Sequence, residues 1–288
     1  MKKIFVICFL CLISLNVSGC LKRDNLEDIT IYTTVYPFEY ITNRLYGEHS
    51  TIYSIYPDGS DPTKYKLTDK QIKDYSKASL FIFNGLSEEK EYVAPMLKNN
   101  KNMKIIDSTL TMEYTNNIEE LWLDPSNFLM LSQNIKNGLL EYISNHYLKN
   151  NIKENYDSLK IDISNIDAKL KLLSESSNNP TIVVSNDLFK FLEKYNITVI
   201  SLEENDNLTE KTIYDVKNLI ENGEINYIFT DQNEEVNQTV QDIVDTYGVE
   251  LLSIHNLYNL SEEERTAKSD YISIMNENIE LLKNELYD

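Results

Sequence analysis

Few side chains in this 288-residue chain could bind a metal or carry out catalysis, since it has only three histidines and three cysteines. His49, His146 and His255 are never four residues apart, which excludes the HExxH pattern of helical zinc sites. The seven glycines form neither a GxGxxG nor a GxxxxGK motif, so dinucleotide binding and P-loop chemistry have no support. Ser185 lies in no GxSxG turn. We therefore do not predict an enzyme.

The first residues of the chain have the pattern of a secretory signal. Lysines at positions 2 and 3 precede an apolar run over residues 4–15, and small residues follow at positions 18 and 19. The apolar run is too short to span a bilayer comfortably, and small residues are typical of a cleavage site. We predict a signal peptide over residues 1–19.

Cys20 is the cysteine on which a membrane anchor would depend. The sequence Val-Ser-Gly-Cys that ends at Cys20 resembles the bacterial lipobox, in which the cysteine is acylated and becomes the mature N-terminus. Several acyl chains on one residue give stable anchoring. We therefore expect a lipidated tether over 20–28 and a protein held on the extracytoplasmic face of the cell membrane. Cys8 and Cys11 form a CxxC inside the segment to be removed, so that pair carries no redox or zinc prediction.

Composition and charge narrow the class of partner. The chain is 42% hydrophobic and 25% charged, which is typical of a globular protein with a substantial core. Its 27 Lys and Arg against 46 Asp and Glu give a formal net charge of −19. Such a field repels phosphate backbones, so no nucleic-acid partner is expected.

Eight short β-prone runs alternate with helical stretches, in two sets of four. The predicted strands cover residues 29–35, 51–56, 80–83 and 104–106 in the first set and 181–184, 197–202, 227–230 and 249–254 in the second. Strands that alternate with helices predict parallel sheets with helices packed outside. The expected fold is α/β, with two lobes and a ligand cleft between them at the carboxyl ends of the strands.

A different kind of segment separates the two sets. From Ile152 to Leu173, apolar residues recur at alternating spacings of four and three, which predicts one stripe on a helix of about 22 residues. The stripe could pair with another chain as a coiled coil or lie across the two lobes as a strut. We favour the strut because of its position between the sets. The predicted organisation is an N-terminal lobe at 29–148, a connecting helix at 149–177 and a C-terminal lobe at 178–288.

Six fragments, in order, give the chain a resemblance to the solute-binding lipoproteins of bacterial metal ABC transporters. The fragments are Thr-Val-Tyr-Pro at 34–37, a Pro-Asp-Gly-Ser-Asp-Pro-Thr-Lys-Tyr loop at 57–65, Ala-Ser-Leu-Phe-Ile-Phe-Asn-Gly at 78–85, Leu-Trp-Leu-Asp-Pro at 121–125, Ser-Asn-Asp-Leu-Phe-Lys-Phe at 185–191, and Tyr-Ile-Ser-Ile-Met-Asn-Glu-Asn at 271–278. They are similar to the family's P-x-G-x-D-P-H-x-Y, H-x-W-L-D-P and S-H/E-x-x-F-x-Y motifs, among others. The resemblance implies two lobes joined by one rigid helix and a zinc or manganese receptor.

The resemblance does not carry the family's metal ligands with it. The four cleft positions that match them are Thr63, Leu121, Asn186 and His255. Zinc is held by deprotonated nitrogen, sulfur or carboxylate donors, usually four of them. Leu121 has no donor atom, and Thr63 and Asn186 offer weak neutral oxygens. We therefore predict a degenerate metal site, with no confident cofactor.

Several cleft residues keep more than one interpretation. His255 could be a metal ligand, a hydrogen-bonding group for an organic solute, or an ordinary loop residue. Asp187 could turn into the cleft or cap a helix, and carboxylates at the start of helices are commonly caps. Tyr36 and Tyr65 are further cleft candidates because both fall in loops that follow strands.

Three functions remain open. The first is a solute-binding lipoprotein with the degenerate site, working as a monomer with an ABC transporter permease, as the resemblance implies. The second is a working zinc or manganese receptor with a rearranged ligand set such as His255, Asp187 and Asp61. The third is a surface adhesin, which would show an exposed apolar patch away from the cleft.

Overall fold

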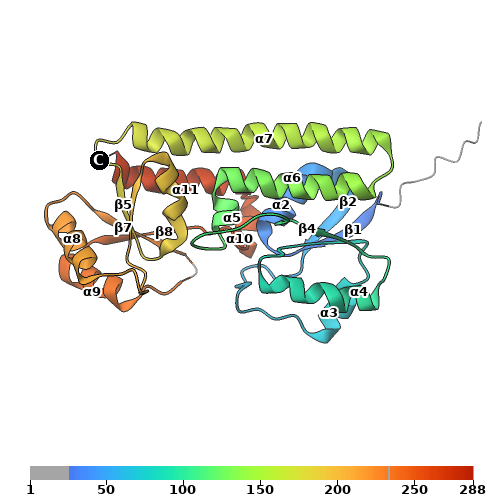
Figure 1. Cartoon of the computed structure of the whole chain (residues 1–288), viewed down its shortest axis with the longest axis horizontal. Helices are drawn as coiled ribbons and strands as arrows, with labels where there is room; N and C mark the ends of the chain where they lie inside the picture. Colours follow the sequence, from blue (N-terminus) through green and yellow to red (C-terminus); the bar gives the residue numbers. More distant parts are fainter. Residues whose placement is uncertain (1–25, 233, 288) are drawn as a thin grey trace, which may run out of the picture.

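The computed structural model describes residues 26–232 and 234–287. The predicted signal peptide and the Cys20 anchor lie outside these residues and stay predictions. Within the described ranges, no helix is both long and apolar enough to cross a membrane. The chain folds into two α/β lobes, side by side beneath one long helix (Figure 1).

The N-terminal lobe is built on a parallel sheet with the strand order β2-β1-β3-β4. Its strands are β1 (Ile29–Thr33), β2 (Ser50–Ser54), β3 (Leu80–Phe83) and β4 (Lys104–Asp107). β3 is buried at every position, as expected for an inner strand covered on both faces. Ile31 pairs with Ile52 and with Leu80, so the carboxyl ends of β1, β2 and β3 meet at one edge.

The C-terminal lobe repeats this topology with the order β6-β5-β7-β8, again all parallel. Its strands are β5 (Thr181–Val184), β6 (Thr198–Ser201), β7 (Tyr227–Asp231) and β8 (Glu250–Ile254). All eight predicted strands are confirmed, and none of their ends is displaced by more than two residues. The predicted fold class is therefore confirmed.

Helices connect the strands and cover the sheets. In the first half they are α2 (Tyr36–Tyr46), α3 (Asp69–Tyr75), α4 (Val93–Asn99), α5 (Glu120–Leu123) and α6 (Pro125–Tyr142), with the 3-10 helices η1 (Gly47–His49) and η2 (Glu88–Tyr92). In the second half they are η3 (Asp187–Tyr195), α8 (Glu210–Glu221), α9 (Gln238–Tyr247), α10 (Glu262–Ala267) and α11 (Tyr271–Leu286).

The long helix α7 (His146–Glu175) runs across both lobes. It starts earlier than expected because the Asn145 side chain caps it by accepting the N–H groups of Tyr147 and Leu148. Its inward stripe is almost fully buried, at Ile152, Leu159, Ile163, Ile166, Leu170 and Leu173. The stripe packs against α6, α11 and α2 of the same chain. The strut interpretation is therefore confirmed, because packing within the molecule uses the apolar face.

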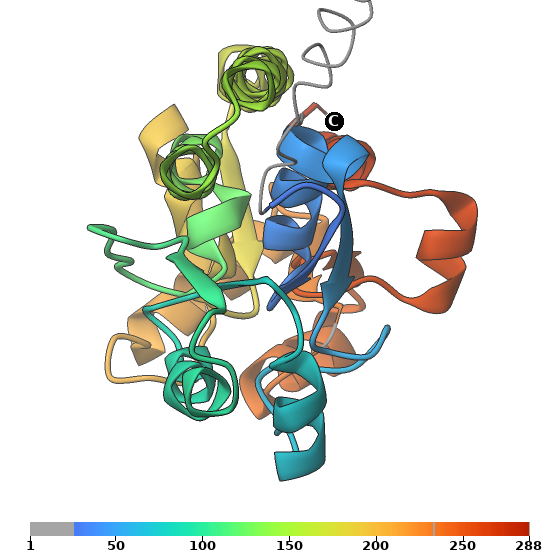
Figure 2. The same cartoon turned by 90° about the vertical axis from the view of Figure 1, so that its right-hand side faces the viewer.

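One hydrophobic core passes through both lobes. Ile31 and Ile82 of the first sheet and Ile182 and Phe229 of the second belong to the same cluster, and Trp122 is fully buried within it. Figure 2 shows α6 and α7 end-on and side by side above the sheets, where they cover this core. A shared core of this kind makes the lobes one packed body instead of two bodies on a hinge.

After β8 the chain returns to the N-terminal lobe before α11 begins. This segment, residues 255–270, is called here the C-terminal return. The Tyr36 N–H donates to the Tyr258 carbonyl at 3.0 Å, and the Gly59 N–H donates to the Leu260 carbonyl at 2.8 Å. The indole N–H of Trp122 donates to the Asn256 carbonyl at 2.7 Å. The end of the chain thus completes the N-terminal lobe.

Candidate functional site

A hollow of about 160 Å³ lies where loops at the carboxyl ends of the two sheets face each other. It is lined by residues of both halves of the chain, including Asp61, Pro62, Gln232, Asn256, Tyr258 and Glu264. We call it the interlobe crevice. Its position is the one that open α/β sheets use for ligands, which agrees with the predicted cleft.

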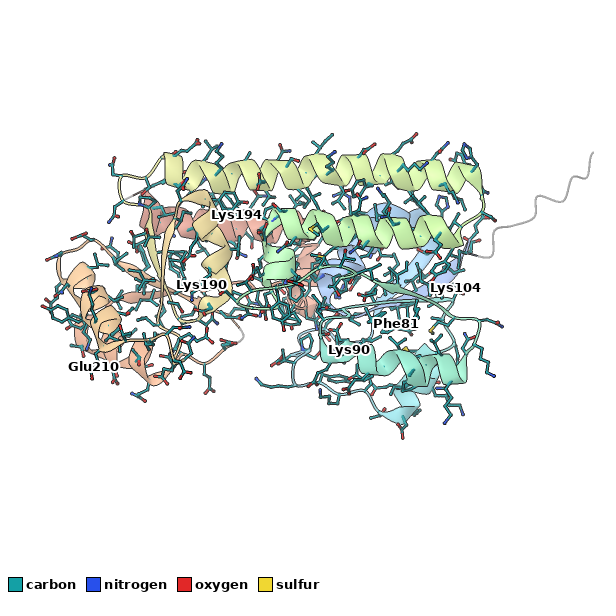
Figure 3. All side chains as sticks on the ribbon, in the orientation of Figure 1. Phe81, Lys90, Lys104, Lys190, Lys194 and Glu210 are labelled. Carbon is teal, nitrogen blue, oxygen red and sulfur yellow. The ribbon has the colours of Figure 1, made fainter. Side chains whose placement is uncertain are left out.

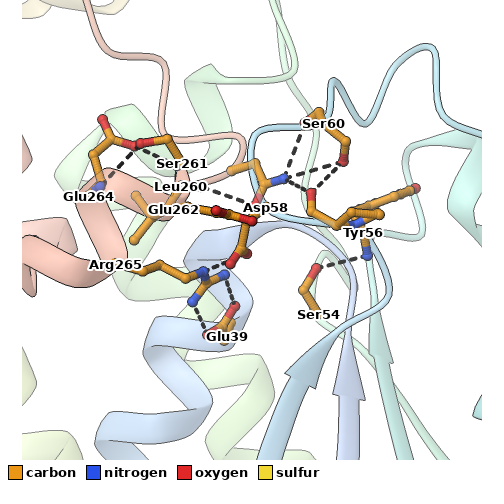
Figure 4. Close-up of polar contacts among 12 residues, drawn as sticks. Glu39, Ser54, Tyr56, Asp58, Ser60, Leu260, Ser261, Glu262, Glu264 and Arg265 are labelled. Atoms are coloured by element: carbon orange, nitrogen blue, oxygen red, sulfur yellow. Dashed lines mark hydrogen bonds and ion pairs between the residues drawn. The ribbon is translucent and has the colours of Figure 1, made fainter.

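Ion pairs and hydrogen bonds fasten one wall of the interlobe crevice (Figure 4). Arg265 of α10 donates to both carboxylate oxygens of Glu39 at 2.8 and 2.9 Å, and its Nε donates to Asp58 at 2.5 Å. The Asn259 amide donates to the Pro57 carbonyl at 2.6 Å. Bidentate pairs hold geometry well, so the C-terminal return is tied firmly to α2 through Glu39, and it is also tied to the loop after β2 through Asp58 and Pro57.

Thr63, the first matched ligand position, is exposed and bonded within its own loop. Its hydroxyl donates to Asp61 Oδ1 at 2.6 Å, and its N–H donates to the same oxygen at 2.9 Å. Lys64 lies 2.9 Å from the other carboxylate oxygen of Asp61. Partial burial would raise the pKa of Asp61, but the bonds from Thr63 and Lys64 outweigh it and lower the pKa. Asp61 is therefore a loop-forming carboxylate.

Leu121, the second position, lies away from the crevice. It is fully buried in the shared core as part of α5, which differs from the expected cleft placement. The H-x-W spacing of the family motif in fact puts its His two residues before Trp122, at Glu120. Glu120 accepts the N–H groups of Thr115 and Asn116, each at 3.2 Å, so its carboxylate closes the preceding loop.

Asn186, the third position, caps the 3-10 helix η3. Its Oδ1 accepts the Leu188 N–H at 3.0 Å, and its Nδ2 donates to Glu234 at 2.6 Å. Asp187 follows in the first turn and pairs with Lys190 at 2.9 Å. The cap expected of Asp187 is therefore supplied by its neighbour, and the Asp187 carboxylate already has a cationic partner.

His255, the fourth position, is buried beside the crevice with both ring nitrogens facing groups of the chain itself. Nδ1 accepts the Leu257 N–H at 2.8 Å, which places the proton of the neutral ring on Nε2. Nε2 lies 3.1 Å from Glu264 Oε1. Burial lowers the pKa of His255, although Glu264 acts in the opposite direction. A metal could bind this ring only by displacing one of these contacts.

Glu119 is the residue of this region that the sequence analysis missed. It is buried, and its Oε2 has no hydrogen-bond partner among the described residues. Burial, followed by the charges of Asp231, Glu234 and Asp61, raises the pKa of Glu119 to about 8. The available signal was the Glu-Glu pair directly before the Leu-Trp-Leu-Asp-Pro segment.

The two candidate tyrosines have different surroundings. Tyr36 begins α2 and is buried beneath Arg265, whose guanidinium carbon lies 5.9 Å from the ring centre. Tyr65 lines a larger cavity of about 540 Å³ in the N-terminal lobe. Only Tyr65 therefore borders space that a solute could fill.

A zinc or manganese ion would need several charged or imidazole donors close together. In the described part of the chain, no three His, Cys, Asp or Glu side chains are grouped so as to hold a metal. Thr63, Glu120, Asn186 and His255 are each bonded to neighbours, and Leu121 has no donor atom. Zn²⁺ prefers several deprotonated ligands at about 2 Å, and these residues do not fit that need.

Comparisons with known proteins place the chain beside metal-transport receptors. Residues 31–285 match the family described as "Zinc-uptake complex component A periplasmic". The chain is 25% identical over 239 residues to the metal ABC transporter substrate-binding lipoprotein SloC of Streptococcus mutans, covering 76% of this chain and 78% of that protein. It is 26% identical over 248 residues to the manganese ABC transporter substrate-binding lipoprotein scaA of Streptococcus gordonii, covering 77% and 78% respectively.

A solved structure agrees with the fold. The Zn(II)-bound ZnuA-like domain of Streptococcus pneumoniae AdcA superposes with a TM-score of 0.72 at 19% identity, covering 91% of this chain and 100% of that domain. At this identity the likeness concerns the fold alone.

Proposed function

The chain belongs to the zinc-uptake complex component A family, and from this premise we propose that it is an extracytoplasmic solute-binding lipoprotein with a degenerate metal site. Its named relatives are substrate-binding proteins of ABC transporters and not enzymes, as the sequence analysis expected. In this proposal Cys20 carries the lipid anchor, an ABC transporter permease is the partner, and the protein is a monomer. The crevice does not hold Zn²⁺ or Mn²⁺ through the inherited positions.

The contacts of His255 are the observation that carries this proposal. It is the one imidazole beside the crevice within the described residues, and both of its nitrogens face internal partners, the Leu257 N–H and Glu264. Burial also lowers its pKa, so the ring is neutral and structural at neutral pH. Without it, the inherited positions provide no strong metal donor except the Glu120 carboxylate, whose Oε2 already accepts two backbone N–H groups.

The alternative of a working metal receptor is favoured by one observation, the buried and unpartnered Oε2 of Glu119. The charges of Asp61, Asp231 and Glu234 act on it, and carboxylate oxygens suit Mn²⁺. His255 and Asp187, which this alternative would recruit, are already engaged with Glu264 and Lys190. We therefore rank this alternative second.

Metal titration separates the two proposals. A chain that begins at residue 21 contains every described residue, and after treatment with chelator it is titrated with Zn²⁺ and Mn²⁺ by calorimetry. We expect no saturable heat and no rise in melting temperature, because the donors at the inherited positions are already engaged. Binding would be easy to detect, since a ligand at 100 times its Kd adds about 2.7 kcal/mol of stability.

Two variants identify the origin of any metal binding that is observed. His255→Ala tests the crevice imidazole, and His146→Ala, an exposed residue at the start of α7, is the matched control. Stoichiometric binding below about micromolar Kd, lost in His255→Ala and kept in His146→Ala, would overturn the degenerate-site proposal.

A further inference from the structure

The largest cavity near the crevice is lined by tyrosines and lies mainly in the N-terminal lobe. Its volume is about 540 Å³, and its walls include Tyr56, Tyr65, Tyr92, Tyr114 and Tyr258. We call it the tyrosine cavity. Tyr56 and Tyr65 lie in the loop after β2, Tyr92 ends η2, and Tyr114 lies in the segment before α5. Tyr258 comes from the C-terminal return. Lys90, which is labelled in Figure 3, marks the position of η2. Its volume is in the range of small-molecule sites.

Local contacts hold several of these rings in place. The rings of Tyr56 and Tyr65 meet edge to face, with centres 5.9 Å apart. Gln71 donates to the Tyr65 hydroxyl at 2.7 Å, and the Leu67 N–H donates to the Tyr92 hydroxyl at 3.3 Å. The aromatic walls are therefore organised before any ligand arrives, which reduces the entropy cost of binding.

Two tyrosine hydroxyls and one carboxyl group border this cavity. Among the described residues, no hydrogen bond is made by the hydroxyl of Tyr56 or of Tyr258, although both side chains are largely buried. Glu89 is 6% exposed and forms part of the wall. One of its oxygens accepts the Asn84 N–H at 3.1 Å, but it forms no ion pair within the described ranges, and burial raises the pKa of its carboxyl group to about 7. A buried carboxylate without a cationic partner costs free energy.

Two buried acids act on Tyr258 from opposite sides. Burial and then the charges of Glu119 and Glu89 raise the pKa of the Tyr258 hydroxyl. Lys66 lines the mouth of the cavity but is paired with the exposed Glu88. The cavity thus combines aromatic rings with one buried acid, Glu89, that lacks a counter-charge. A cation with an apolar body would contact the rings and favour the ionised form of Glu89.

We propose that the tyrosine cavity binds a small organic cation, an amine whose ammonium group lies among the tyrosine rings and beside Glu89. The rings cover the apolar body of the amine, and the hydroxyls of Tyr56 and Tyr258 accept its N–H groups. A neutral alcohol of the same shape would leave Glu89 without a counter-charge. This inference goes beyond the proposed function, since it concerns a different cavity and holds whether or not a metal binds the crevice.

A matched pair of probes tests the charge requirement directly. The chain from residue 21 is titrated with benzylamine and with benzyl alcohol by calorimetry, and the fluorescence of Trp122 provides a second signal. Trp122 is the single tryptophan, and its ring lies 4.9 Å from that of Tyr258. We expect benzylamine to bind with a stoichiometry of one and at least about tenfold more tightly than the alcohol.

Variants locate the binding in the cavity. Glu89→Gln keeps the side-chain shape and removes the charge, so it should abolish most of the preference for the amine. Tyr114→Ala removes a ring that is 43% exposed, so we expect the variant to fold. It should weaken the binding of benzylamine by about threefold. Tyr214→Phe, on exposed α8 of the other lobe, is the control and should change nothing.

Three results would overturn the inference. The first is equal affinity for the amine and the alcohol. The second is no binding of benzylamine up to about 10 mM, a concentration at which even a weak Kd of about 1 mM would give a signal. The third is an unchanged preference for the amine in Glu89→Gln. If Glu89→Gln does not fold, the wild-type comparison and Tyr114→Ala decide the matter. Zinc binding that requires His255 would overturn the proposed function and leave this inference intact.

Discussion

The interlobe crevice and the tyrosine cavity are neighbours that share Pro62 and Tyr258, yet their polar groups are satisfied in opposite ways. In the crevice, the Asn256 amide donates to both oxygens of Asp231 at 3.1 and 2.9 Å, and His255 lies against Glu264. In the cavity, the hydroxyls of Tyr56 and Tyr258 make no hydrogen bond among the described residues, and Glu89 accepts the Asn84 N–H but has no cationic partner there. Polar groups that bond one another hold two segments of the chain together, whereas polar groups without such partners are available to a ligand.

The interlobe crevice lies where open α/β sheets hold their ligands, whereas the tyrosine cavity is where this chain has side chains available to a ligand. The crevice keeps the inherited position at the carboxyl ends of the strands, and Arg265 with its two acidic partners holds the C-terminal return that forms one of its walls. The cavity owes nothing to the matched ligand positions apart from the exposed Thr63 at its edge. Chemistry at each site therefore has to be argued from side chains and not from the fold.

Removing the wall behind both sites should have the largest effect. Trp122 is fully buried, packs edge to face on Tyr258 and donates to the Asn256 carbonyl. Trp122→Ala should lower the free energy of unfolding by about 4 kcal/mol, measured by urea denaturation. Tyr147→Ala, on the exposed start of α7, is the control. A loss below about 1 kcal/mol would mean that the two sites do not share a rigid wall.

Releasing the joint alone should cost less. Arg265→Met keeps the apolar stem but leaves Glu39, which is 9% exposed, without its bidentate partner. We expect a loss of about 2 kcal/mol in the free energy of unfolding, below the range for fully buried pairs because Arg265 is itself partly exposed. Binding of benzylamine should survive. Lys77→Met, which breaks an exposed pair with Asp74, should stay within about 0.5 kcal/mol of wild type.

The smallest effect is expected from Glu119, a buried acid on which the charges of Asp231, Glu234 and Asp61 act. A raised pKa means that folded Glu119 holds its proton more tightly than the unfolded chain does. Its contribution to stability is therefore full below its unfolded value of 4.5 and is lost as pH rises through about 8. Glu119→Gln should be more stable than wild type at pH 8 by roughly 1 to 2 kcal/mol, with the difference vanishing near pH 4.

Urea denaturation across this pH range measures the difference. Glu154→Gln on the exposed face of α7 is the control, and its stability should follow the wild-type pH profile. Parallel profiles for Glu119→Gln and wild type would show that Glu119 ionises as an ordinary surface carboxylate. Glu119 would then not be the buried acid that raises the pKa of Tyr258, the residue shared by crevice and cavity.

Much of the fold could be read from the sequence because its signals are local. The buried run Leu80–Phe83 and the heptad-like stripe from Ile152 to Leu173 depend on neighbouring residues alone, and both were placed correctly. The course of residues 255–270 could not be read in this way, since its partners Tyr36, Gly59 and Trp122 are more than a hundred residues distant.

The candidate sites were harder to predict for a related reason. Motif matching put Thr63, Asn186 and His255 near the crevice, but whether their donor atoms were free depended on partners such as Asp61, Glu234 and Glu264. Glu119 and Glu89 escaped notice because burial of an acid is a tertiary property. The tyrosines were interpreted as mostly core residues, and only Tyr65 was singled out among the five that surround the cavity.

The C-terminal return also sets the order in which the molecule can be built. Tyr271, directly after the C-terminal return, donates its hydroxyl to the backbone carbonyl of Trp122, a contact that spans 149 residues of sequence. The Trp122 indole N–H donates to the Asn256 carbonyl across 134 residues. The first lobe emerges early during synthesis but cannot close its core until almost the whole chain has left the ribosome. Contacts of such long range slow folding, so the unfinished lobe stays open for most of translation. We therefore expect a chain truncated after β8 to lack a folded N-terminal lobe, although this lobe is synthesised first.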